Sequence, residues 1–133
     1  MEPVIVWYLR MSVIYFIAGV AVGLGMLLWP SESGYYLPVH VHLNLLGFMS
    51  MMIYGVGYHI LPKFSGRHIY SPQIVKVQFW MANAGLIGMA VSWPFHISGD
   101  IPVAETSLIL FAVTSLIAIV LFAFNIMKTV KSM

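Results

Sequence analysis

Apolar side chains fill four long stretches of this sequence, and short polar or turn-forming segments separate them. The stretches cover approximately residues 4–29, 39–61, 74–95 and 106–127. Each is long enough to cross a bilayer, because a hydrocarbon core of roughly 30 Å takes about 20 helical residues. Lipid offers no partner to backbone polar groups, so spanning segments of this kind are stable as helices. The pattern predicts an all-α integral membrane protein with four transmembrane helices.

The connections between the stretches are short and rich in turn-forming residues. Proline, glycine and serine recur in residues 30–34, 62–67 and 98–102, where they favour turns. Short connections make sequence neighbours antiparallel neighbours in space, which predicts a four-helix bundle. The chain has 133 residues, of which 61% are hydrophobic and 8% charged. We therefore expect one transmembrane domain over residues 1–133 and no separate soluble domain.

Basic and acidic residues fall on opposite sides of the predicted bundle. All the lysines and arginines belong to one side: Arg10, Lys63, Arg67, Lys76, Lys128 and Lys131. Glu32, Asp100 and Glu105 belong to the other side, which has no basic residue. The positive-inside rule then places both termini and the second connection in the cytoplasm, as expected for a multi-pass protein of the cytoplasmic (inner) membrane. The chain has no basic run, so nucleic acid is not an expected partner.

Small residues repeat four positions apart in two of the predicted helices. Gly19 and Gly23 form one pair, and Ala84 and Gly88 form another. Such pairs let helix backbones approach closely, either within one chain or between protomers. We interpret them first as packing within the chain, with a homo-oligomer contact as the alternative.

Histidine is the residue type expected to carry the chemistry of this chain. The sequence has no cysteine, which excludes thiolate metal sites. His40, His42 and His96 are expected towards the outer side, and His59 and His68 towards the inner side. Three imidazoles near one face of a small bundle would suit haem iron, copper or zinc. The three outer histidines are therefore candidate metal and cofactor ligands.

Helical geometry separates His40 from His42. Two positions correspond to roughly 200° around a helix, so the two rings point to nearly opposite sides and cannot chelate one ion. The stripe of His40 continues through Asn44, Gly47, Met51, Tyr54 and Tyr58. The stripe of His42 is apolar and continues through Leu45, Leu46, Met49, Ile53 and Val56. Periodicity favours His40 for the interior, whereas the apolar stripe of His42 could face lipid or the flat ring of a cofactor.

The segment HVHLNLLGFMSMMIYGVGYHILPKFSGR, residues 40–67, resembles the second transmembrane helix of subunit I in the haem-copper oxidase superfamily. The likeness is closest to the nitric oxide reductase and C-type oxidase branch and to small subunit I-like proteins. In that family the helix opens with a histidine that ligates the low-spin haem. The positions that match the family pattern here are His42, Asn44, Leu45, Leu46, Gly55, Tyr58, Leu61 and Pro62. By this resemblance His42, rather than His40, takes the position of the haem ligand.

The resemblance implies a b-type haem held by His42. The second axial ligand would be His96, His40 or a histidine of a second protomer. Two imidazole ligands suit electron transfer with a redox partner, and one open position suits binding of a diatomic gas such as NO or O2. The family's remaining haem and copper ligands lie in later helices that this sequence does not contain. We therefore expect no oxidase or reductase activity from this chain by itself, and other enzymatic activity is left open.

Two other functions are consistent with the sequence. A copper-binding membrane protein could use His40 and His42 with methionines such as Met49, Met51 and Met52. A membrane interaction subunit without a cofactor is the other alternative. A four-helix chain has little interior for a ring as large as haem, so the haem hypothesis also predicts a homodimer or higher oligomer. Because the outer side has no basic residue, haem propionates would need tryptophan, tyrosine, backbone N–H groups, water or another subunit.

Overall fold

The computed structural model describes residues 2–130, and these residues form helices and no strands. The elements are α1 Pro3–Leu28, η1 Pro30–Glu32, α2 Ser33–His42, η2 Leu43–Ser50, α3 Met51–Phe64, α4 Pro72–Ser98 and α5 Val103–Thr129. Four helical segments are long and apolar enough to span a membrane, since the elements from η1 to α3 run on as one segment, Pro30–Phe64. The predicted all-α architecture with four transmembrane helices is confirmed.

The second helical segment begins earlier than the hydropathy pattern predicted. We expected residues 30–34 to be a connection, but the chain breaks its helical course only around Trp29, which has φ −127° and ψ 74°. Pro30 then occupies the first turn of the next helical element, where its fixed φ is already suitable and its missing N–H costs nothing. Hydropathy marks which residues lie in lipid, and a helix can continue beyond them into water.

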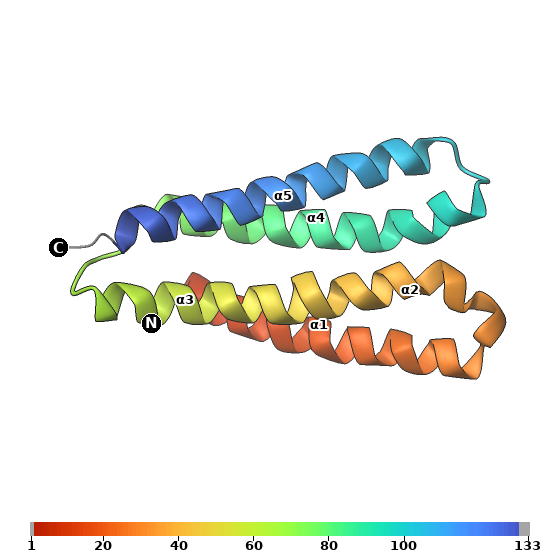
Figure 1. The fold of residues 1–133 in the computed structure, drawn as a ribbon, viewed down its shortest axis with the longest axis horizontal. Coiled ribbons are helices and arrows are strands. Elements are labelled where there is room, and N and C mark those ends of the chain that lie inside the picture. Colours follow the sequence, from red (N-terminus) through yellow and green to blue (C-terminus); the bar gives the residue numbers. More distant parts are fainter. Residues whose placement is uncertain (1, 131–133) are drawn as a thin grey trace.

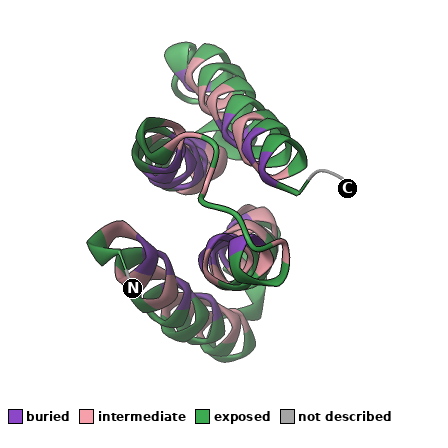
Figure 2. Ribbon diagram, turned by 90° about the vertical axis from the view of Figure 1, so that its left-hand side faces the viewer, coloured by how far each residue is buried: buried purple, intermediate pink, exposed green. Residues whose placement is uncertain are grey.

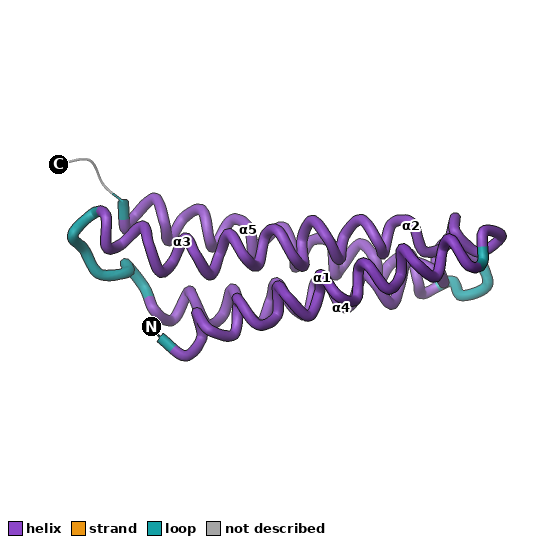
Figure 3. Tube along the Cα trace, turned by 90° about the horizontal axis from the view of Figure 1, so that it is seen from below, coloured by secondary structure: helices purple, strands orange, loops and turns teal. Residues whose placement is uncertain are grey.

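The helices lie side by side in a long bundle, with connections only at its two ends (Figures 1 and 3). Viewed from the end, the α2–α3 segment and α4 lie in the middle, while α1 and α5 lie at opposite corners (Figure 2). This arrangement agrees with the helix contacts, in which α1 packs along η2 and α3, and α5 packs along α4. Both ends of the described chain lie at the same end of the bundle (Figure 1). The placement of that end in the cytoplasm stays a prediction.

Polar side chains link α1 to α4 across the interior. The hydroxyl of Tyr8 donates to the carbonyl oxygen of Val75 at 3.0 Å and also contacts the side-chain oxygen of Gln78. Two turns further along α1, the hydroxyl of Tyr15 donates to Oδ1 of Asn83 at 2.5 Å. Such bonds between helices help to hold a membrane bundle together where apolar burial gives no driving force.

The small residues of α1 are used within the chain. A Cβ added to Gly19 would lie 2.6 Å from the amide nitrogen of Asn44, and one added to Gly23 would lie 2.8 Å from Cε1 of His40. These glycines therefore let α1 approach the second helical segment closely. The pair therefore packs within the chain. Its other suggested role, as a contact between the protomers of a homodimer, would need the same surface of α1.

Candidate functional site

His40 and His42 point towards different helices. Nδ1 of His40 lies 2.7 Å from the carbonyl oxygen of Gly19 on α1. The ring of His42 instead packs against Trp93 on α4, with ring centroids 4.7 Å apart and planes inclined by 41°. The structure thus confirms the geometric prediction that the two rings cannot chelate one ion.

Each of these rings has one nitrogen held by a backbone carbonyl. His40 bonds to the oxygen of Gly19, and Nδ1 of His42 lies 2.8 Å from the oxygen of Pro38, one turn earlier on its own helix. A carbonyl oxygen only accepts, so Nδ1 must carry the hydrogen in both neutral rings. Nε2 is then left with a free lone pair, which is the arrangement found in most histidines that ligate metals. Both histidines are therefore chemically suited to bind iron through Nε2.

The backbone changes its winding immediately after His42. Residues of η2, Leu43–Ser50, form a π-helix, in which hydrogen bonds span five residues instead of four. The hydroxyl of Ser50 donates to the carbonyl oxygen of Leu45 at 2.9 Å, five positions earlier. π-helical turns occur frequently at functional sites. The sequence predicts a regular α-helix here and carries no simple signal for the π-helical turns.

The two stripes of the second helical segment have different surroundings. On the His40 stripe, Gly47, Met51, Tyr54 and Tyr58 are buried and form part of the core. On the His42 stripe, Leu45, Met49 and Ile53 are about half exposed. The prediction that the His40 stripe faces the interior of the bundle is therefore confirmed. His42 itself is only partly buried and stands at the start of an apolar surface that faces out of the bundle.

The other three histidines have different surroundings from His40 and His42. His96 is exposed in the last turn of α4, one turn beyond Trp93. His59 accepts a hydrogen bond at Nε2 from the amino group of Lys63 at 3.0 Å, and His68 is exposed in the connection between α3 and α4.

Residues 2–130 contain no group of three histidine, cysteine, aspartate or glutamate side chains that could hold a metal ion. Within the described residues, His40, His42 and His96 therefore do not form such a group. His40 turns towards α1 and His42 towards α4, so the two rings lie on different faces of their helix. Ligation of iron by single histidines stays a prediction.

Two of the methionines proposed for copper differ in burial and lie on different sides of their helical segment. Met51 is fully buried in the core, whereas Met49 is half exposed on the other side of the same helix. A soft-ligand copper site needs its sulfur and imidazole ligands to converge on one point. The geometry of the described residues gives the copper hypothesis no support.

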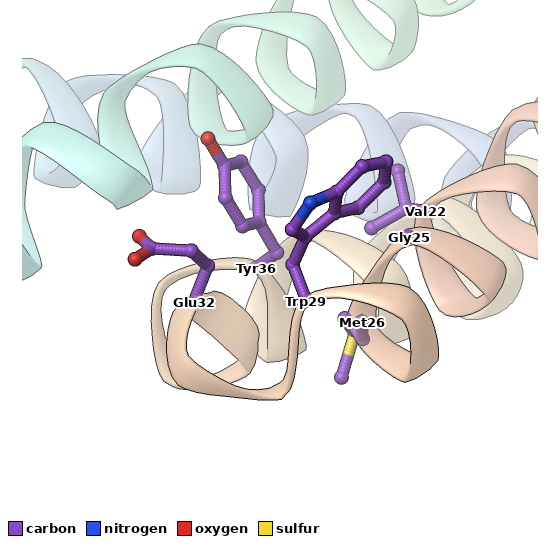
Figure 4. Close-up of a pocket in the computed structure, with 6 residues that line it drawn as sticks. All are labelled: Val22, Gly25, Met26, Trp29, Glu32 and Tyr36. Atoms are coloured by element: carbon purple, nitrogen blue, oxygen red, sulfur yellow. The ribbon is translucent and has the colours of Figure 1, made fainter.

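Two cavities open near the ends of the helices that carry His40 and His42. One of about 370 Å³ lies between α1 and the start of the second helical segment, and Figure 4 shows its lining residues Val22, Gly25, Met26, Trp29, Glu32 and Tyr36. A second of about 430 Å³ lies between α2 and the last turns of α4, and its polar lining includes Tyr35, Ser98 and Asp100. The indole and phenol groups can donate hydrogen bonds, but neither lining contains a lysine or arginine.

Comparison with known proteins relates part of this sequence to cytochrome oxidases. The chain is 41% identical over 56 residues to the cytochrome c oxidase subunit 1 homolog of Agrobacterium tumefaciens (strain T37), covering 41% of this chain and 10% of that protein. It is 37% identical over 49 residues to the Cbb3-type cytochrome c oxidase subunit CcoN1 of Stutzerimonas stutzeri, covering 36% of this chain and 10% of that protein. The same identity and length hold for cytochrome c oxidase subunit 1 of Rhodobacter capsulatus, of which 9% is covered.

The similarity is confined to short segments. The chain spans about a tenth of the length of these curated relatives. No family model matches the sequence, and no solved structure does. The fold and the comparisons together define a multi-pass membrane protein. Within it, a short stretch is similar to cytochrome c oxidase subunit I.

Proposed function

We propose that this chain is a b-type haem protein of the cytoplasmic membrane, related to oxidase subunit I, that transfers electrons or binds a diatomic gas. His42 is the axial ligand in this proposal. The observation that carries it is the hydrogen bond from Nδ1 of His42 to the carbonyl of Pro38, which leaves Nε2 free. The similarity to the cytochrome oxidase subunits supports haem rather than another metal group.

The residues around His42 suit a flat apolar group. Trp93 packs beside its ring, and the exposed side chains of Leu45 and Met49 continue the apolar surface below it. Tyr35 and Tyr36 line the cavity between α2 and the last turns of α4, on the side towards which His42 points, and would supply donors for propionate groups. When bound, a haem supplies a one-electron redox couple or an iron position open to a gas. Nε2 of His42 would bind the iron, and Trp93, Leu45 and Met49 would provide apolar contacts for the ring.

In this proposal the second axial ligand is His96 or a histidine of a second protomer. His40 lies on the α1 side of its helix, so it cannot bind the same iron as His42 within one chain. His96 stands on α4 beyond Trp93 and is exposed, which leaves it free to turn. A histidine of a second protomer is the alternative. Since the His42 surface faces out of the bundle, we propose that a second copy of this chain covers the haem.

The absorption spectrum of the purified protein tests this proposal. A Soret band at stoichiometric intensity is expected for the wild-type protein. A colourless protein would refute the proposal and leave a cofactor-free interaction subunit or, with bound copper, a copper protein.

Single histidine variants then test the ligands. His42→Ala should abolish haem binding or convert a six-coordinate spectrum into a five-coordinate one, because the ligating Nε2 is removed. His40→Ala is the matched control, since this ring lies two positions away on the opposite side of the helix. His96→Ala should behave like His42→Ala if both ligands come from one chain, and should leave the spectrum unchanged if a second protomer provides one. An unchanged spectrum in His42→Ala with loss of haem in His40→Ala would show that the wrong histidine was chosen.

A further inference from the structure

A third cavity, of about 500 Å³, lies at the opposite end of the bundle from Trp29, between the N-terminus of α1, the end of α3 and the start of α4. Its polar lining consists of Glu2, Tyr58, His59, Lys63, Arg67 and His68. This cavity is separate from the proposed haem surface, because His42 and His59 are seventeen positions apart on one helical segment, or roughly 25 Å.

Positive charge predominates around the cavity. The lining contains two basic residues, Lys63 and Arg67, and one carboxylate, that of Glu2. His59 and His68 add two further groups with N–H donors. The amino group of Lys63 donates a hydrogen bond to Nε2 of His59 at 3.0 Å, so the two side chains lie next to each other in the cavity lining. A lining of this kind attracts anions and provides several hydrogen-bond donors for them.

The start of α4 adds to the positive potential. Pro72, the first residue of α4, lines the cavity, and the first turn of this helix contains no acidic residue. The N-terminal end of a helix carries partial positive charge, which stabilises anions close to it. The backbone and the side chains therefore favour the same kind of ligand.

We propose that this cavity binds a phosphate-bearing anion, either the headgroup of an anionic phospholipid or a soluble phosphate. Lys63 and Arg67 pair with the phosphate oxygens. Apolar residues such as Ile5 and Ile69 complete the lining and suit the glycerol and acyl part of a lipid. Basic pockets between transmembrane helices commonly bind anionic headgroups.

The experiment uses the full-length protein in a mild detergent and counts bound lipid by native mass spectrometry. Phosphatidylglycerol, phosphatidylcholine and inorganic pyrophosphate are the probes. The test variant is Lys63→Gln with Arg67→Gln. The matched control is Lys76→Gln with Lys128→Gln, which removes two exposed cations from the same end of the bundle but outside the cavity.

We expect the wild-type protein and the control to retain phosphatidylglycerol in preference to phosphatidylcholine. The test variant should bind phosphatidylglycerol roughly 30-fold more weakly, at about 1 kcal/mol for each basic residue. Displacement of the lipid by pyrophosphate would identify a soluble phosphate as the ligand, and resistance to displacement would identify the lipid. Equal losses in the two double variants, or no loss in either, would overturn the proposal.

Discussion

Replacing Gly23 by alanine tests how closely α1 approaches the histidine helix. The new Cβ would lie 2.8 Å from Cε1 and 3.0 Å from Nδ1 of His40, closer than side-chain atoms normally come. His40 is also tied to the carbonyl of Gly19, so its ring cannot move aside without losing that hydrogen bond. The matched control is Gly25→Ala in the same helix, where an added Cβ meets nothing within 4 Å.

The expected magnitude follows from comparing the two variants. Replacing a helical glycine by alanine gains about 0.5–1 kcal/mol from lower backbone entropy in the unfolded chain, and both variants share this gain. The clash at Gly23 adds an overpacking cost of about 1–3 kcal/mol. Gly23→Ala should therefore be less stable than Gly25→Ala by about 1–3 kcal/mol, since only the overpacking cost distinguishes them.

The assay is reversible unfolding in mixed micelles by increasing sodium dodecyl sulfate, followed by circular dichroism. The wild-type protein and both variants are measured under identical conditions, so that the free-energy differences are compared directly. If Gly23→Ala proves as stable as Gly25→Ala, then α1 does not approach His40 as closely as the structure indicates. The placement of the His40 ring against α1 would then also be wrong.

Three further predictions concern orientation, a hydrogen bond and assembly. Reporter fusions after Ser33 and Gly99 should be external, and one after Ser65 cytoplasmic, because every lysine and arginine falls on one side; the opposite pattern would reverse the topology. Tyr15→Phe removes the hydrogen bond to Asn83 and should cost about 0.6 kcal/mol, at most about 1.7, in the same unfolding assay; an unchanged stability would show that this bond contributes nothing. Native mass measurement should find a homodimer or higher oligomer, and a monomer with full haem content would exclude a haem shared between protomers.

Much of the fold could be predicted from the sequence because a bilayer imposes a simple rule on it. A segment in lipid must be apolar and must satisfy its backbone internally, so four apolar stretches of sufficient length imply four helices. The helical stripe through Met51, Tyr54 and Tyr58 was also readable, and the structure buries it. The beginning of the second helical segment was misplaced, because residues around Pro30 are helical without being apolar.

The site depended on information that the sequence does not carry. Periodicity showed that His40 and His42 point apart, but it could not show which helix each would meet. Only the packing of α1 on one side and α4 on the other gives His40 the carbonyl of Gly19 and His42 the ring of Trp93. Within residues 2–130, His96 does not form a three-ligand group with the other two.

The number of spans, their antiparallel order and the positively charged end of the bundle could therefore be predicted from the sequence alone. These are properties of single segments in lipid, and they follow from local composition. The partner that each histidine contacts and the packing role of Gly19 and Gly23 follow only from the tertiary structure. Those features depend on contacts between residues far apart in the chain, which arise only when the helices pack together.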